Sequence, residues 1–187
     1  MIAARYPHIS LDTYLARERE SAEKHEYLDG LVYMMAGASV THVRITSNTS
    51  RSLGNQLADR PCDVFSSDMR VRTPSGLVAY PDVVVVCGEP YLQDDRGDVL
   101  LNPVVVIEVL SPSTEEYDRT TKFDHYRTIP WLKEYVLIAQ EVRRIERRSR
   151  IDIEWEVTVI DDPDGRIDLA PIGCTLALAD VYARVQF

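Results

Sequence analysis

Cysteines, basic residues and long apolar runs are all scarce in this 187-residue sequence. The 3 cysteines, Cys62, Cys87 and Cys174, lie far apart and show no C-x-x-C spacing, so the pattern indicates neither a disulfide framework nor a zinc knuckle. We therefore expect the reducing environment of the cytoplasm. The N-terminal segment lacks the apolar stretch of a signal peptide, and no apolar run approaches the ~20 residues of a membrane span. We expect no association with a membrane.

The shortage of basic residues limits the partners that the chain can attract. The sequence has 21 Lys and Arg against 30 Asp and Glu, a formal net charge of −9, which repels a polyanion unless the basic residues gather on one face. This argues against a protein that coats DNA nonspecifically. The arginines that could form a local basic surface are Arg44, Arg51, Arg70, Arg72 and the five between 143 and 150. The last group is at least equally well explained as protection of a strand edge.

The composition that remains, 45% hydrophobic and 27% charged residues, is typical of a compact globular domain. No repeat or flexible linker divides the sequence, so we expect one domain over residues 1–187. Two valine-rich runs, 81–87 and 103–110, predict central strands covered on both faces. The intervening residues 88–102 are predicted to be a long polar loop without secondary structure.

Helices and antiparallel strands are predicted on both sides of this centre. Ser10 and Ser39 are candidate caps of two helices, the second with Val43, Leu53 and Leu57 on one face. Further elements are a hairpin at Asp29-Gly30, a strand over 63–73 with one wet face, a helix over 113–129 that Ser113 and Glu116 begin as a capping box, and four C-terminal strand segments from 134 onward that end in a meander. This order predicts an α/β or α+β fold with a mixed central sheet.

Glu108 is the main anomaly, because a carboxylate within VVVIEVL loses several kcal/mol of hydration unless a cation or hydrogen-bond donors replace the water. We expect it to emerge where the strand end meets solvent. Asp82 opens the other central run, so neighbouring strands would let the two carboxylates converge on one divalent cation. Asp68 either supplies a third oxygen or begins a strand through an Asx turn.

A lysine follows the acids at helical spacing. Asp118, Lys122 and Tyr126 are four residues apart, so their side chains share one face of the predicted helix. These residues either form an ordinary surface ion pair or bring Lys122 close to the acids.

The runs YPDVVVV and NPVVVIEVLSPST, followed by D-x-x-x-K-x-x-x-Y, resemble the PD-(D/E)XK nuclease superfamily. More narrowly, residues 11–182 resemble a bacterial family of putative restriction endonucleases expanded in cyanobacteria, including EYLDGLVYMMAGAS-x-x-H and the EYVLI strand. The resemblance implies a restriction-endonuclease-like mixed sheet flanked by helices, with an N-terminal hairpin and C-terminal antiparallel strands. It also implies Mg²⁺ or Mn²⁺ held by Asp82 and Glu108. Leu110 stands where the usual lysine would be, and the resemblance to the narrower family implies Lys122, on the following helix, as its replacement.

The resemblance adds Glu26 and His42 to the site, as a second ligand and as a proton carrier or water-orienting group; His42 is equally a structural histidine. The implied activity is metal-dependent hydrolysis of phosphodiester bonds in DNA by an endonuclease, with a homodimer expected by analogy alone. Two alternatives stay open. One is a catalytically silent relative that binds nucleic acid or a protein, and the other is a hydrolase of a different phosphoester.

Overall fold

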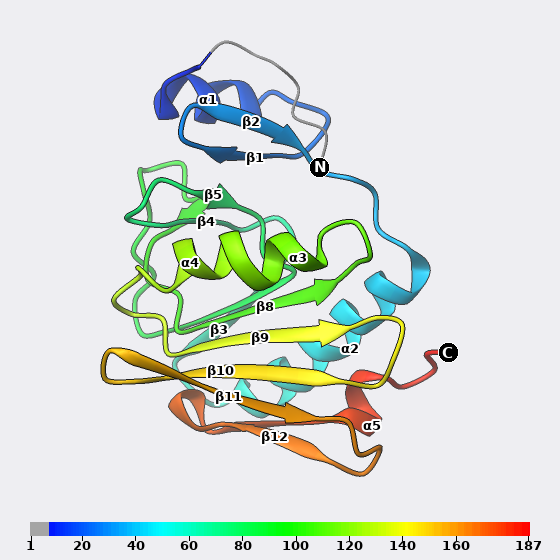
Figure 1. Cartoon of the computed structure of the whole chain (residues 1–187). Coiled ribbons are helices and arrows are strands. Elements are labelled where there is room, and N and C mark those ends of the chain that lie inside the picture. The colour runs from blue at the N-terminus through cyan, green and yellow to red at the C-terminus, as the bar shows by residue number, and fades with distance from the viewer. Residues whose placement is uncertain (1–7) are drawn as a thin grey trace.

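The computed structural model of the protein describes residues 8–187, arranged as Figure 1 shows. A six-stranded sheet occupies the centre, in the strand order β11-β10-β9-β8-β6-β3. Its strands are β3 (Cys62–Ser66), β6 (Val83–Cys87), β8 (Val105–Leu110), β9 (Glu134–Ala139), β10 (Ile145–Ile151) and β11 (Glu154–Ile160). The two valine-rich strands β6 and β8 are antiparallel neighbours in its middle. Strand β9 pairs in parallel with β8, so the predicted mixed sheet is confirmed.

A second sheet lies above the central one in Figure 1. It has five strands in the order β2-β1-β5-β4-β7. These are β1 (His25–Leu28), β2 (Leu31–Met34), β4 (Arg70–Arg72), β5 (Val78–Ala79) and β7 (Val99–Leu100). The hairpin between β1 and β2 is the one predicted, because Asp29 and Gly30 both adopt positive φ, 49° and 84°, as a two-residue hairpin turn requires.

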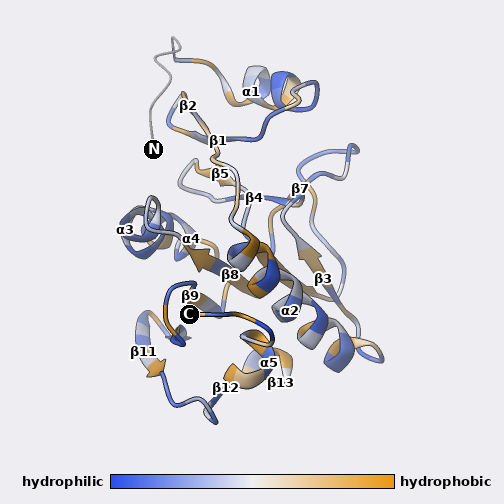
Figure 2. Ribbon diagram, turned by 90° about the vertical axis from the view of Figure 1, so that its right-hand side faces the viewer, coloured by the Kyte–Doolittle hydropathy of each residue, from blue (hydrophilic) through white to orange (hydrophobic). Residues whose placement is uncertain are grey.

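The two faces of the central sheet are covered by different helices. Helix α2 (Val40–Leu57) packs on one face, and a helical segment made of α3 (Glu115–Tyr117), the π-helical turn η1 (Asp118–Lys122) and α4 (Phe123–Tyr126) packs on the other. Ile107 contacts the side of α2, while Val106 and Leu110 contact the side of α4, as the two-residue alternation of a strand dictates. Figure 2 shows the apolar strand β8 between these helices.

Two of the three predicted helix starts are correct. The hydroxyls of Ser10 and Ser39 accept hydrogen bonds from backbone N–H groups and cap α1 (Leu11–Glu18) and α2. The predicted capping box at Ser113 is wrong, since the cap position is Thr114 and its side chain makes no capping bond. The prediction for Val43 is also wrong, because this side chain is largely exposed. Within residues 8–187, no helix is long and apolar enough to span a membrane.

The last two strands separate from the central sheet. Strands β10 and β11 form the predicted hairpin, but β12 (Arg166–Leu169) pairs with β13 (Cys174–Ala177) in a sheet of its own. Between them lies the 3-10 turn η2 (Ala170–Ile172), and α5 (Leu178–Val181) follows. The small sheet buries apolar side chains against the face that carries α2. The predicted continuous meander is therefore wrong in its last step, because these side chains pack over the core.

Two predictions for residues 63–102 are also wrong. The strand predicted over 63–73 is split between two sheets, because Ser67 adopts a left-handed conformation with φ 46°. Its supposedly wet face includes Arg70, which is buried and forms an ion pair with Asp98. The connection 88–102 is not without structure, since it contains β7, which pairs with β4.

The prediction about cysteines is wrong for one pair. Cys62 and Cys87 form a disulfide, because antiparallel pairing of β3 with β6 puts these two residues directly opposite each other. Their separation of 25 residues in sequence gives no hint of this register. Cys174 is buried as a free thiol.

Candidate functional site

Glu108 lies under the helical segment rather than at the solvent. Its position in β8 directs it toward the face covered by η1 and α4, and only 3% of its surface is exposed. The expectation that it emerges at a strand end is therefore wrong. The alternation of the strand was correctly assigned, but the sequence does not reveal that a helix covers this face.

The buried carboxylate is compensated by Lys122. The Lys122 Nζ lies 3.2 Å from Glu108 Oε1, 2.9 Å from Glu26 Oε1 and 3.2 Å from Asp118 Oδ1. All four side chains are at most 7% exposed. We call Glu26, Glu108, Asp118 and Lys122 the Lys122 cluster. The structure thus brings the displaced lysine to the acid, and Glu26 joins them from β1 in the other sheet.

The local helix geometry explains how Lys122 reaches this position. Asp118 and Lys122 are the first and last residues of η1, where the helix widens to a π turn. Such turns are rare and occur frequently at functional sites. One turn later, the Tyr126 hydroxyl lies 3.3 Å from Glu108 Oε1 and donates to it. The spacing of four residues noted in the sequence therefore places three polar groups of one helix face around Glu108.

The electrostatics of the Lys122 cluster are unbalanced, with three carboxylates around one ammonium group. Burial raises the pKa of the Glu108 carboxyl well above its ordinary value; Lys122 opposes this shift, and the nearby acids Asp118, Asp82 and Glu26 add to it. This matches the expectation that crowded acids raise at least one pKa. Burial alone would lower the pKa of Lys122, but the surrounding carboxylates raise it, so the amine stays charged. Burial, and then Glu108, raise the pKa of the Tyr126 hydroxyl, so it remains a donor.

Asp82 lies beside Glu108, held by two hydrogen bonds. Its Oδ2 accepts from the backbone N–H of Val109 at 2.7 Å, and its Oδ1 lies 2.7 Å from His42 Nε2. The first bond ties the Asp82 carboxylate to the backbone of the residue that follows Glu108, so Asp82 is near enough to contribute to the raised pKa of Glu108. The second ties it to the first turn of α2, which carries His42.

Asp68 is the one predicted site residue that the structure does not bring to this group. Its side chain is 87% exposed and forms an ion pair with Lys24 at the surface. Tyr117 was missed by the sequence analysis. Its ring centroid lies 5.7 Å from Lys122 Nζ, and its position one residue before Asp118 gives no periodic signal.

The predicted basic surface is largely consumed by internal contacts. Arg148 donates to the carboxylate of Glu146 and to the carbonyl of Arg119, and its guanidinium lies 4.4 Å from the ring of Phe123. The other arginines that bind internal partners through their side chains are Arg44, Arg51, Arg70, Arg72, Arg147 and Arg150. Strand β10 is also not an edge strand, so edge protection does not explain its arginines. They anchor neighbouring segments instead.

The donor set is compatible with a hard divalent cation. Within residues 8–187, no three His, Cys, Asp or Glu side chains are arranged together as a ready metal site. Mg²⁺, however, is commonly held by one or two carboxylates with water completing its shell. Asp82 and Glu108 supply two carboxylates from adjacent segments of the sheet, and each Asp82 oxygen, which accepts one hydrogen bond, retains a second lone pair. The excess of negative charge over Lys122 also favours a further cation.

The fold and the site together define the class of protein. The crystal structure of a putative nuclease from Anabaena variabilis superposes with a TM-score of 0.77, covering 95% of this chain and 99% of that one. Its sequence identity is 19%, so the likeness establishes a shared fold. The chain is therefore an α+β protein that shares the fold of this putative nuclease and contains a buried carboxylate–lysine cluster.

The family follows from the sequence comparisons. The chain belongs to the Uma2 family, described as putative restriction endonucleases, whose model matches residues 11–179. Two uncharacterized proteins of Synechocystis sp. are similar over nearly their whole length. One is 37% identical over 172 residues, which cover 91% of this chain and 97% of the relative, and the other is 34% identical over 188 residues, covering 99% and 97%.

Proposed function

We propose that the protein is a metal-dependent endonuclease that hydrolyses phosphodiester bonds in DNA. The observation that carries this proposal is a buried lysine held by three carboxylates, with Asp82 bonded to the backbone next to one of them, Glu108. Membership of a family described as putative restriction endonucleases supports the same reaction class. An ion pair that only holds the fold needs one carboxylate for its lysine, and burying such a pair costs free energy.

Asp82 and Glu108 would hold Mg²⁺ or Mn²⁺. When bound, the ion supplies a Lewis acid for a phosphate oxygen and makes water more acidic. Because burial raises the pKa of Glu108, the ionised carboxylate becomes available only as pH rises. We expect metal affinity to increase with pH for this reason.

Lys122 would act as a fixed cation rather than as a base. Its neighbours raise its pKa, so the amine does not give up a proton at neutral pH. It can orient the attacking water or neutralise charge on the scissile phosphate. His42, bonded to Asp82 through Nε2, has its second ring nitrogen to orient a water molecule or accept its proton.

Cleavage of supercoiled and single-stranded DNA with Mg²⁺, Mn²⁺ or EDTA tests the proposal. We expect metal-dependent nicking by the wild type, reduced at least about 100-fold in Asp82→Asn, Glu108→Gln and Lys122→Met. Asp98→Asn is the matched control, because it removes a carboxylate from an ion pair outside the site. Equal cleavage by all variants would indicate a contaminating nuclease and contradict the proposal.

The silent relative is the second candidate, favoured by the two hydrogen bonds that already occupy Asp82. Calorimetry with Mn²⁺ separates it from the enzyme. Absence of both cleavage and metal binding would support the silent relative. Metal binding that needs Asp82 and Glu108, without DNA cleavage, would instead indicate a different phosphoester as substrate.

A homodimer is part of the same proposal, since two copies would place two sites against the two strands of a duplex. Sedimentation equilibrium at micromolar concentration gives the mass directly. We expect twice the 21.3 kDa of one chain, and a monomeric mass during double-strand cleavage would contradict the dimer.

A further inference from the structure

A pocket of about 310 Å³ opens beside the Lys122 cluster, where strands β8 and β9 end. This volume is at the lower end of the range for small-ligand sites. Leu110 lines it and points to the same side of β8 as Glu108, so the two positions are about 7 Å apart along the strand. Gln140 lines it from the end of β9, and Ser39, three residues before His42, donates to its side-chain oxygen. The pocket thus adjoins both halves of the candidate site.

The charges around the pocket divide into a paired group and an unpaired group. Arg119 forms ion pairs with Glu115 at 2.8 Å and Glu146 at 2.6 Å, and Arg148 forms a second pair with Glu146. Two carboxylates and two guanidinium groups therefore neutralise one another. They form a fixed wall rather than an anion site.

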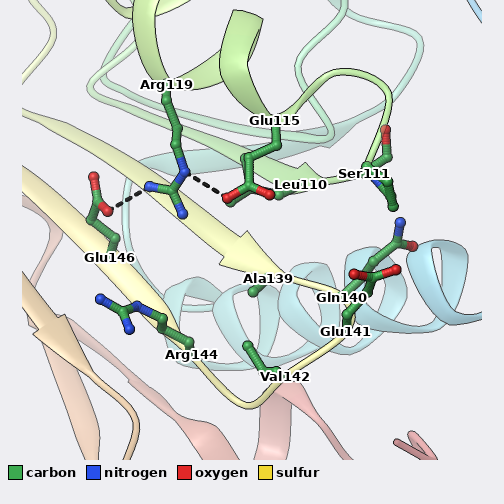
Figure 3. A pocket seen from close by; sticks show the side chains of 11 residues that line it. Leu110, Ser111, Glu115, Arg119, Ala139, Gln140, Glu141, Val142, Arg144 and Glu146 are labelled. Atoms are coloured by element: carbon green, nitrogen blue, oxygen red, sulfur yellow. Dashed lines mark hydrogen bonds and ion pairs between the residues drawn. The ribbon is translucent and has the colours of Figure 1, made fainter.

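Arg144 and Glu141 remain available. The Arg144 guanidinium and the Glu141 carboxylate form no ion pair or hydrogen bond with other side chains of residues 8–187 that would occupy them. Figure 3 shows Gln140 and Glu141 next to Ser111 on one side of the pocket and Arg144 on the other, with Val142 between them. An apolar floor with a donor on one side and an acceptor on the other suits a flat heterocycle better than a phosphate group.

We propose that this pocket binds an unstacked guanine of the substrate strand next to the scissile phosphate. Guanine offers two adjacent acceptors, O6 and N7, and an arginine donating to both is the commonest base-specific contact in DNA recognition. Its ring N–H and amino group lie on the adjacent Watson–Crick edge and suit the Glu141 carboxylate. The apolar floor of Leu110, Ala139 and Val142 would cover one face of the ring, as apolar side chains do in pockets that take a base out of the stack. As a substrate subsite, the pocket rests on the proposed function.

Binding of free deoxynucleosides tests the pocket without metal or cleavage. Chemical shifts of the ¹⁵N-labelled full chain are followed during titration with each of the four deoxynucleosides and, separately, with inorganic phosphate. We expect deoxyguanosine to shift the amides of Gln140 and Arg144 and to bind more tightly than the other three. Arg144→Ala should weaken it about tenfold. Arg143→Ala is the matched control, because its guanidinium lies over Phe187 and does not line the pocket.

The same pair of variants is then compared in cleavage of a randomised DNA duplex. We expect the wild type and Arg143→Ala to prefer guanine next to the cut and Arg144→Ala to lose that preference. The proposal that the pocket binds guanine is wrong if deoxyguanosine does not bind, or if Arg144→Ala leaves its binding unchanged. Arg144-dependent binding by a protein that cuts no DNA would support the pocket while contradicting the nuclease.

Discussion

The Lys122 cluster and a second ionic group, formed by Arg19, Arg70, Asp94 and Asp98, resemble each other in number of residues but not in charge balance. The second group, here called the Arg19 cluster, has two guanidinium groups and two carboxylates. Arg19 donates to both acids, at 2.8 Å to Asp98 and 2.7 Å to Asp94. These bonds lower the pKa of both carboxyls. In the Lys122 cluster, burial and crowding raise the pKa of Glu108.

The Arg19 cluster stabilises the fold, whereas the charge imbalance of the Lys122 cluster destabilises it. The carboxyls of the Arg19 cluster are partly exposed and fully matched, and they join α1 to the connection that contains β7. The Lys122 cluster is buried and carries more negative charge than its lysine can balance. Proteins keep such unfavourable arrangements chiefly at functional sites. Four measurements test whether the two clusters differ in this way.

Removing the central cation should give the largest difference. Lys122→Met leaves three buried carboxylates without a counter-ion, and we expect it to lower the free energy of unfolding by about 3–5 kcal/mol at pH 8. Arg19→Met should cost much less, because solvent reaches Asp94 and Asp98. Urea unfolding followed by circular dichroism measures both, with Lys24→Met as the surface control. Equal losses for Lys122→Met and Arg19→Met would show that the Lys122 cluster is not electrostatically strained.

Neutralising one acid in each cluster should change stability in opposite directions. Glu108→Gln relieves crowding while keeping the shape, so we expect a gain of about 1 kcal/mol, or roughly 2–4 °C in Tm at pH 8. Asp98→Asn removes a matched partner and should lower Tm. Scanning calorimetry of the two variants decides the point, and a lower Tm for Glu108→Gln would contradict the comparison.

The two clusters should also respond oppositely to pH. Glu108 has a raised pKa when folded, so the folded chain retains this proton longer and stability falls as pH rises above the ordinary carboxyl range. Asp98 has a lowered pKa, so its contribution is present above its unfolded pKa and is lost as pH falls through the folded value. Urea midpoints from pH 3 to 9 measure both slopes. Glu108→Gln should flatten only the upper one; an unchanged upper slope would assign it to another group.

The smallest effect concerns the neutral donor of the Lys122 cluster. Tyr126→Phe removes one buried hydrogen bond to Glu108 and should cost about 0.5–1.5 kcal/mol. DNA cleavage should fall less than tenfold, because Lys122 still contacts Glu108. Tyr33→Phe, on the hairpin strand β2, serves as control for the loss of a hydroxyl. A cleavage loss as large as that of Lys122→Met would make Tyr126 an essential group.

Much of the site could be predicted because it lies on strongly patterned elements. The valine-rich runs predicted two central strands that bring Asp82 and Glu108 into the sheet, and the structure shows these strands to be neighbours. The spacing of four residues placed Lys122 and Tyr126 on one helix face. Burial of Glu108 and exposure of Asp68 could not be predicted, because both depend on which distant segment covers the strand. Ser67 illustrates the same limit: one left-handed residue sends two halves of an apparent strand into different sheets.

Local sequence patterns are sufficient to specify the hairpin at Asp29-Gly30, the caps at Ser10 and Ser39, and the central strands, since each depends on local dihedral preferences or on the periodicity of one segment. The contact of Glu26 with Lys122, the bond between Cys62 and Cys87, and the departure of β12 from the meander depend on the tertiary structure. These contacts join residues far apart in the chain. Their register follows from the packing of the whole core, which no local pattern encodes.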